Sequence, residues 1–400
     1  MKKNDNLALH GGKPVRDSYL PYGRQWIDEE DIKAVTNVLK SDFITTGPTI
    51  SQFEKEVAEF VGSKYAVAFS SGTAALHAAC FAAGIKDNDE VITTPMTFAA
   101  SSNCILYTGG SPVFADINPQ TYNISPEAIK PLINEKTKAI ITVDFTGQPA
   151  EYDEIMSLAQ KQGLIVIDDA AHALGATYKE KYIGSIADMT MFSFHPVKHI
   201  TTGEGGMITT DNELYYEKLL EFRSHGITRD PHKLQNFHEP WYYEMQELGF
   251  NYRMTDIQAS LGLSQLKKLK TFLTKRREYA TKYNNAFKNM NEIITPFQKQ
   301  GSNSSWHLYI LRLNVHKLKT NRNEIFKALQ KENIGVNVHY IPVYLHPFYQ
   351  QMGYKKGLCP RAESVYQEII TLPLFPKMSV EDLNDVIAGV QKVISYYSIY

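Results

Sequence analysis

The chain has 400 residues, of which 43% are hydrophobic and 21% are charged. That length and composition supply a large buried core and, from typical domain sizes, predict two domains. Lysine and arginine number 42 against 43 aspartate and glutamate, with no long run of one charge, so we expect small-molecule partners and no nucleic acid.

The first half of the chain predicts a parallel sheet. Between residues 65 and 171, short β-rich runs alternate with helical runs of ten or more residues, a pattern typical of an α/β fold whose sheet is covered on both faces. We expect strands at 65–69, 90–94, 111–117, 139–145 and from 164, and helices at 74–84, 97–110, from 125, and at 152–162. Ligands of such sheets bind beyond the carboxyl ends of the strands.

After about residue 260 the pattern changes, which predicts a large domain over residues 1–260 and a smaller αβ domain over 261–400. A basic helix is expected at 264–287. Its charges interleave with Leu266, Leu269 and Phe272 at helical spacing, which favours an amphipathic connector over a nucleic-acid arm. Strands are expected at 304–315 and 335–344, and a last helix from Val380. The segment around residues 21–26 is expected to pack on the smaller domain.

The sequence gives no indication of a membrane or of export. No apolar run approaches the roughly 20 residues that span a bilayer, and the first residues lack the apolar centre of a signal peptide. The three cysteines are scattered, without a CxxC pair. We therefore expect a reducing, cytoplasmic location.

One lysine lies in a setting that suits covalent chemistry. Lys198 stands in SFHPVKHITTGEGG, between a strand end and a glycine-rich turn. An imine-forming lysine needs a fixed backbone, few competing charges and neighbours that lower the pKa of its ammonium group, so that the free amine can attack an aldehyde. By residue type alone a solvated surface lysine is the more common case.

A second candidate segment is Ser70-Ser71-Gly72-Thr73, between a predicted strand and helix. Free backbone N–H groups, hydroxyls and the positive end of a helix can hold a phosphate dianion. A plain N-cap before an alanine-rich helix needs the same residues. The segment is not a P-loop, because no GK[ST] follows.

A third segment places acidic groups at the sheet edge. Asp168 and Asp169 end the apolar run LIVI, and His172 follows three residues later. A partly desolvated carboxylate there favours a cationic partner such as a protonated pyridine nitrogen. The alternatives are an N-cap with a buried histidine, or a metal held by these three residues or by His195 and His199. Pro196 argues against a metal site at His195 and His199, because a proline between them disturbs the helical spacing that would bring their rings together.

Two further segments are weaker candidates. Phe98, in PMTFAAS, is expected just after a strand, where it could lie on a cofactor ring or simply fill the core. Asn251, in ELGFNYRMTDIQ, begins a polar stretch that could equally be a capped loop before a helix at Asp256.

In their order and spacing, FSSGTAAL, TPMTFAAS, DDAAHALGA, FSFHPVKHITTGEGG and GFNYRMTDIQASLGLSQL resemble the sugar-nucleotide aminotransferases of the DegT/DnrJ type. The resemblance implies pyridoxal 5'-phosphate (PLP) as cofactor and the type I, aspartate aminotransferase-like fold. It implies that Lys198 binds the cofactor covalently, Asp169 pairs with the pyridine nitrogen, His172 lies beside the ring and Phe98 stacks on it. Gly72, Thr73 and Ser193 would hold the phosphate, and Asn251 would reach the phosphate in the other subunit of a homodimer. No metal is implied.

Further segments, RSHGI, WYYEMQELGFNYR and VHYIPVY, resemble the branch of that family that serves pseudaminic acid synthesis. This implies transfer of an amino group from glutamate to a UDP-linked 4-keto-6-deoxy N-acetyl amino sugar, giving UDP-4-amino-4,6-dideoxy-N-acetyl-beta-L-altrosamine. Tyr22, Thr45, His339 and Tyr340 would contact the UDP-sugar. The alternatives are another 4-keto sugar nucleotide, of the bacillosamine or perosamine type, or a non-catalytic PLP-binding regulator.

Overall fold

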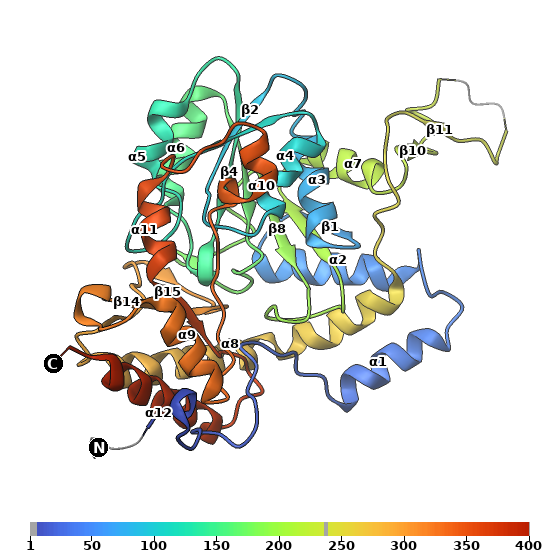
Figure 1. Ribbon diagram of the computed structural model, residues 1–400. Helices are drawn as coiled ribbons and strands as arrows, with labels where there is room; N and C mark the ends of the chain where they lie inside the picture. The colour runs from blue at the N-terminus through green and yellow to red at the C-terminus, as the bar shows by residue number, and fades with distance from the viewer. Residues whose placement is uncertain (1–5, 236–238, 400) are drawn as a thin grey trace.

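The computed structural model describes residues 6–235 and 239–399, and a seven-stranded sheet forms its centre (Figure 1). The strand order is β1-β9-β8-β5-β4-β2-β3. The strands are β1 Tyr65–Phe69, β2 Glu90–Thr93, β3 Ser111–Phe114, β4 Thr137–Val143, β5 Ile165–Asp169, β8 Met189–Ser193 and β9 Gly206–Thr210. All of them run parallel except β9, which is antiparallel to both β1 and β8. The predicted mostly parallel α/β sheet is confirmed.

Helices cover both faces of this sheet, because its strands are apolar on both sides. One face packs against α3 Gly72–Ala82, α4 Ala100–Tyr107 and α7 Glu213–Phe222. The other packs against α2 Pro48–Val61, α6 Tyr152–Gln162 and the first half of α8 Asp256–Phe287. Helix α1 Glu29–Leu39 lies along α8, and the short α5 spans Pro126–Ile129.

A second hydrophobic core lies in the C-terminal part of the chain. It combines the second half of α8 with α9 Arg322–Lys331, α12 Val380–Tyr397 and the sheet β12-β14-β15 (Ile293–Ile294, Tyr309–Leu313, Ile369–Leu372). Leu7 and Leu20 from the N-terminal segment also lie in this core. Because α8 runs through residues 260 and 261 without a break, it belongs to both cores. A domain division at that position stays a prediction.

A third group of buried residues joins the two parts of the chain. Met96 and Phe114, from the sheet side, pack with Tyr344 and Tyr349 from the C-terminal part. The helices α10 Pro347–Gln351 and α11 Pro360–Glu368 lie in this region. Short strand pairs complete the structure: β6 Thr177–Tyr178 pairs with β7 Lys181–Tyr182 and β13 Ser302–Asn303, and β10 Ile227–Thr228 pairs with β11 Glu244–Met245.

The structure corrects two of the predicted elements. The helix predicted at 264–287 is the second part of α8, which starts at Asp256 after a capping box of Thr255 and Gln258. The strand predicted at 335–344 is wrong: only Asn337 forms a bridge, to Thr371, and the last residues of the segment begin the 3-10 helix η5 Val343–Leu345. Strand β15 takes the place beside β14 instead. The last helix starts at Val380 as predicted.

The described part of the chain contains no helix that is both long and apolar enough to cross a lipid bilayer.

Candidate active site

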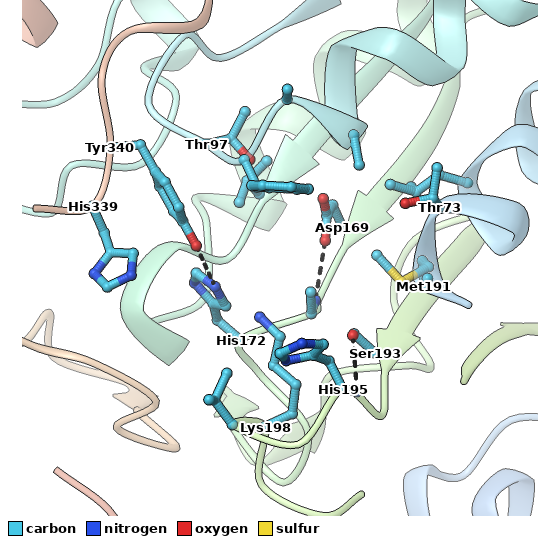
Figure 2. Close-up of a pocket in the computed structure, with 18 of the residues that line it drawn as sticks. Thr73, Thr97, Asp169, His172, Met191, Ser193, His195, Lys198, His339 and Tyr340 are labelled. Atoms are coloured by element: carbon cyan, nitrogen blue, oxygen red, sulfur yellow. Dashed lines mark hydrogen bonds between the residues drawn. The ribbon is translucent and has the colours of Figure 1, made fainter. Parts of the chain in front are cut away.

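A cavity of about 710 Å³ lies at the carboxyl edge of the central sheet. Strands β1, β2, β5 and β8 run in parallel, so the residues that follow them meet at this edge. The cavity is lined by the segments after all four strands and by residues 337–341 of the C-terminal part (Figure 2). Of the predicted site residues, it brings together Tyr22, Gly72, Thr73, Phe98, Asp169, His172, Ser193, Lys198, His339 and Tyr340.

One end of the cavity is formed by the N-terminus of α3. Ser71 caps this helix, and its hydroxyl accepts a hydrogen bond from the N–H of Ala74 at 3.1 Å. The N–H groups of Gly72 and Thr73, in the first turn, have no acceptor earlier in the helix and are available to an anion. A Cβ at Gly206, the first residue of β9, would lie 2.5 Å from the carbonyl oxygen of Ser71, so glycine is needed there. Ser193, at the end of β8, faces the same turn.

Asp169, the last residue of β5, places a carboxylate in the cavity wall. The hydroxyl of Ser101 donates to Oδ2 at 2.5 Å, and the N–H of Ala171 donates to Oδ1 at 3.1 Å. Burial raises the pKa of this carboxyl, while these two hydrogen bonds and nearby Lys198 act in the opposite direction. Asp169 forms no ion pair with any of the described residues. A cation binding beside it would offset the cost of burying its charge.

Lys198 lies on the connection between β8 and β9, with its amine directed into the cavity (Figure 2). Desolvation lowers the pKa of this amine to about 8; Asp169 opposes the shift and Arg276 adds to it. Its side chain is exposed only in part. A substantial fraction of the amine is therefore neutral near pH 8 and can react with an aldehyde.

The side of the cavity opposite α3 combines residues from both parts of the chain. The hydroxyl of Tyr340 lies 3.3 Å from Nε2 of buried His172, and the two rings stack (Figure 2). His339 bonds through Nδ1 to the hydroxyl of Thr371 at 2.9 Å, and its ring lies 5.2 Å from the ring of Tyr22. These contacts fix the orientation of four side chains that come from three distant parts of the sequence.

Phe98 is not a core residue: 62% of its surface is exposed, and it lines the cavity. Its ring lies 6.3 Å from that of Tyr340. An exposed aromatic ring over a cavity suits stacking on a flat ligand.

Two predicted site residues lie outside the cavity of their own chain. Thr45 is exposed and forms a bridge with Thr255. Asn251 is exposed and forms a bridge with Ser224, while the carbonyl of the next residue, Tyr252, accepts a hydrogen bond from Ser70.

The structure does not bring together the residues of the two alternative metal sites, Asp168, Asp169 and His172 or His195 and His199. Asp168 and Asp169 are neighbours on β5, so their side chains point to opposite faces. Asp168 accepts a hydrogen bond from Thr142 at 3.0 Å, away from the cavity, and burial raises its pKa to about 7. His195 is exposed and lines the cavity, whereas His199 is buried behind it. Among residues 6–235 and 239–399, no three histidine, cysteine or acidic side chains form a metal-binding group.

The sequence-based reasoning missed several residues of this region. Ser101, which holds Asp169, stands in the motif PMTFAAS one helical turn after Phe98, and that spacing could have revealed it. Asn337 and His346 line the cavity from the irregular C-terminal segment, which carries no local pattern for them. Arg276 and His307 lie behind Lys198, and only the tertiary structure brings them there.

The cavity fits PLP. A helix N-terminus with hydroxyl groups suits the phosphate, a buried carboxylate without a cation suits a pyridinium, and a lysine with a lowered pKa suits the aldehyde. Its volume falls within the range of cofactor and ligand pockets. Gly72 supports the fit, because a Cβ there would lie 3.2 Å from the sulfur of Met191 and would narrow this end of the cavity.

Comparison with known proteins also indicates a PLP-dependent enzyme. The model of the DegT/DnrJ/EryC1/StrS aminotransferase family matches residues 25–391. The chain is 44% identical over 381 residues to the spore coat polysaccharide biosynthesis protein SpsC of Bacillus subtilis, covering 95% of this chain and 98% of SpsC.

Solved structures agree with the sequence comparisons. Helicobacter pylori PseC, described as an aminotransferase involved in the biosynthesis of pseudoaminic acid, superposes with a TM-score of 0.89 at 35% identity, covering 95% of this chain and 100% of PseC. The putative sugar aminotransferase Spr1654 from Streptococcus pneumoniae, solved in its PLP form, superposes with a TM-score of 0.88 at 32% identity, covering 94% of this chain and 99% of Spr1654. This chain therefore belongs to the DegT/DnrJ/EryC1/StrS aminotransferase family and is a PLP-dependent sugar aminotransferase that resembles PseC.

Proposed function

We propose that this enzyme transfers the amino group of glutamate to the 4-keto position of a UDP-linked 4-keto-6-deoxy N-acetyl amino sugar. The product would be UDP-4-amino-4,6-dideoxy-N-acetyl-beta-L-altrosamine. The observation that carries the proposal is the cavity itself, in which Lys198 and Asp169 face Tyr22, His339 and Tyr340. The similarity to PseC over 95% of the chain supports the choice of sugar.

In the proposed reaction, Lys198 would bind the cofactor through its amine and, once released, would transfer a proton. PLP, when bound, supplies an aldehyde and an electron-withdrawing ring that stabilises the negative charge left by removal of a proton. Asp169, held by Ser101 and Ala171, would keep the ring nitrogen protonated. Lys198, once its amine is free, would take the proton from the carbon that carries the donor's nitrogen and deliver it to the cofactor carbon next to the ring.

The other residues would bind and orient the reactants. Thr73, Ser193 and the first N–H groups of α3 would anchor the phosphate. His172 is tied to Tyr340 and would fix the position of the ring's phenolic oxygen. The sugar would lie near Tyr22 and His339, the side of the cavity formed by both parts of the chain. In the second half of the cycle the keto sugar replaces the keto acid, and the same lysine moves the proton in reverse.

Purified enzyme incubated with glutamate and a panel of UDP- and dTDP-linked 4-keto sugars tests this proposal, with products followed by mass. The UDP-linked 4-keto-6-deoxy-L-altrosamine precursor should gain an amine faster than any D-configured sugar. Equal or faster amination of a D-gluco or dTDP substrate would overturn the choice of sugar. Failure to form 2-oxoglutarate from glutamate with every sugar would overturn glutamate as the donor.

The similarity to SpsC supports a second candidate, because its identity of 44% exceeds the 35% with PseC. SpsC is described only as a spore coat polysaccharide biosynthesis protein. The alternative substrate that we propose is another 4-keto sugar nucleotide, of the bacillosamine or perosamine type. The same panel separates the two candidates.

We also propose a homodimer with shared active sites. Thr45 and Asn251 lie outside their own cavity, and both stand among exposed apolar side chains, with Ile44 50% and Phe250 36% exposed. The nearby arm that carries β10 and β11 projects from the body of the molecule (Figure 1), and its Leu248 is 75% exposed. Exposed apolar residues in such number mark a protein interface.

Mixing two variants tests the shared site. A dimer of one Lys198→Ala chain and one Asn251→Ala chain would contain one doubly damaged site and one intact site. Subunit exchange should then restore about a quarter of wild-type activity, because half the dimers are mixed and each has one good site. No gain, with exchange verified by two tags and Asn251→Ala alone shown to be impaired, would place Asn251 outside the partner's site.

A further inference from the structure

His339 lies in the wall of the cavity (Figure 2), and both nitrogens of its ring have hydrogen-bond partners. Nδ1 lies 2.9 Å from the hydroxyl oxygen of Thr371, and Nε2 lies 3.3 Å from the amide nitrogen of Asn337. Only 6% of the surface of His339 and 1% of that of Thr371 are exposed, so water competes little for these bonds.

The backbone holds the two partners of His339 in place. The N–H of Asn337 donates to the carbonyl of Thr371 at 3.1 Å, and the N–H of Thr371 donates to the carbonyl of Asn337 at 2.8 Å. Residues paired in this way carry their side chains on the same side, so both reach one ring. Tyr22, whose ring centre lies 5.2 Å from that of His339, accepts a backbone hydrogen bond from Leu374.

A backbone N–H decides which way the Asn337 amide faces. The N–H of Val338 can only donate, and it lies 2.8 Å from Oδ1 of Asn337. The NH2 end of the amide therefore faces His339, and this end can also only donate. Nε2 of His339 has to accept that hydrogen bond, so Nε2 carries no proton.

The proton of the neutral ring then lies on Nδ1, which donates to the hydroxyl oxygen of Thr371. A second proton, on Nε2, would face the hydrogen atoms of the Asn337 amide, so the hydrogen bonds oppose an imidazolium. Burial acts in the same direction and, together with nearby Lys198, lowers the pKa of His339 to about 3.

The titratable groups around His339 do not favour its protonation either. The ring centres of Tyr22 and Tyr340 lie 5.2 Å and 4.8 Å from that of His339, and burial raises the pKa of both tyrosines, so neither is an anion at neutral pH. The positive charge of Lys198 opposes a second cation. His172 stays neutral, because burial lowers its pKa well below the ordinary value.

We propose that Asn337 is a positioning residue of the active site, which holds His339 as a neutral imidazole with its proton on Nδ1. With both nitrogens occupied, His339 takes no part in the proton transfer assigned above to Lys198. It offers the sugar an uncharged ring beside the ring of Tyr22. This role toward the sugar rests on the proposed function, whereas the state of the imidazole does not.

Hydrogen–deuterium exchange at the carbon between the two ring nitrogens measures the pKa of a single histidine. The exchange rate rises with pH and becomes level above the pKa of that ring. In the full-length holoenzyme, tandem mass spectrometry of the peptides assigns the deuterium to His339 rather than to His346. The wild-type rate at His339 should be level from about pH 4.5 to about pH 9, because the ring titrates below that range. A midpoint within that range would overturn the proposal without any variant.

Asn337→Asp reverses the hydrogen bond to His339. One carboxylate oxygen can still accept from Val338, but the other faces Nε2 and can only accept, which favours a proton there. The midpoint of His339 should rise by about two pH units or more, into the measured range. Asn337→Ala removes the amide without adding an acceptor and should cause a smaller rise. No rise in folded Asn337→Asp, or an equal rise in both variants, would overturn the proposal.

Asn103→Asp is the matched control. Asn103 is half-buried like Asn337, and its Oδ1 also accepts a hydrogen bond, from the hydroxyl of Tyr349 at 2.7 Å, but it lies on α4 and does not line the cavity. A carboxylate at that place should leave the exchange of His339 level. A rise equal to that in Asn337→Asp would mean that any added charge acts on His339, and would overturn the role of Asn337.

Sugar kinetics test the role of the neutral ring. In Asn337→Asp, the KM for the sugar nucleotide should change with pH around the midpoint found by exchange, while the half-reaction with glutamate keeps its wild-type pH dependence. A KM that does not follow this midpoint would overturn the placement of the sugar beside His339 and leave the neutral state of the imidazole standing. Because exchange needs no sugar, failure of this proposal is distinguishable from failure of the proposed function.

Discussion

The two sides of the cavity are built differently. The side at the central sheet consists of residues that end or directly follow parallel strands, and one of them, Asp169, is held by hydrogen bonds from Ser101 and Ala171. The opposite side is residues 337–346, a segment without an α-helix or a strand, whose Tyr340 reaches His172 through a single hydrogen bond of 3.3 Å. A rigid sheet edge suits groups that take part in bond making, whereas irregular segments more often carry recognition. We therefore expect changes at the sheet edge to affect the chemical step and changes in residues 337–346 to affect mainly the sugar.

The largest effect is expected for Lys198→Ala. Alanine cannot bind the cofactor covalently or move the proton, while Asp169, Phe98 and the N-terminus of α3 can still hold the ring and the phosphate. Turnover should fall below detection, with an unchanged circular dichroism spectrum and PLP still retained after gel filtration. Substantial remaining aminotransferase activity would show that another residue carries the reaction.

Asp169→Asn should reduce kcat/KM by about a thousandfold. The substitution keeps the shape but removes the charge opposite the ring nitrogen, a loss of several kcal/mol at a partly desolvated ion pair. Asp168→Asn is the matched control, since its side chain points away from the cavity. A loss below tenfold in Asp169→Asn, or an equal loss in both variants, would contradict the pairing of Asp169 with the ring.

Ser101→Ala should have a smaller effect, about ten- to a hundredfold on kcat. The lost hydrogen bond goes to a carboxylate, and such bonds contribute about 1.5–3 kcal/mol. Ser102→Ala is the control: Ser102 is the next residue of α4, also buried, and accepts a hydrogen bond from Tyr349 rather than facing Asp169. Similar losses in the two variants would indicate a general disturbance of α4.

The smallest effect is expected for Tyr340→Phe, a loss of about tenfold or less. One hydrogen bond between neutral groups contributes about 0.5–1.5 kcal/mol, and the aromatic contacts with His172 and Phe98 remain. The change should appear mainly in KM for the sugar, with the half-reaction with glutamate nearly unchanged in single-turnover kinetics. A larger loss in the glutamate half-reaction than in the sugar half-reaction would remove the distinction between the two sides of the cavity.

The sequence by itself determined the parallel sheet and the group of residues at its edge. Short β-rich runs followed by SSGT, PMTF, DDAAH and SFHPVK place Thr73, Phe98, Asp169 and Lys198 together, because parallel strands all end at one edge. Local patterns also predict the start of α12, where Ser379 caps the helix.

Only the tertiary structure decided the opposite side of the cavity and the surroundings of Lys198. The segment 335–344 has a strand-like composition but forms no strand, and the strand that pairs with β14 on that side is β15. In the sequence, Arg276 is one of many charged residues of a basic helix. In the structure it is buried, because the segments next to β14 and β15 pack on that turn of α8 and supply the carbonyls of Trp306 and Leu374. Such effects arise from contacts between residues a hundred positions apart, and local periodicity carries no information about them.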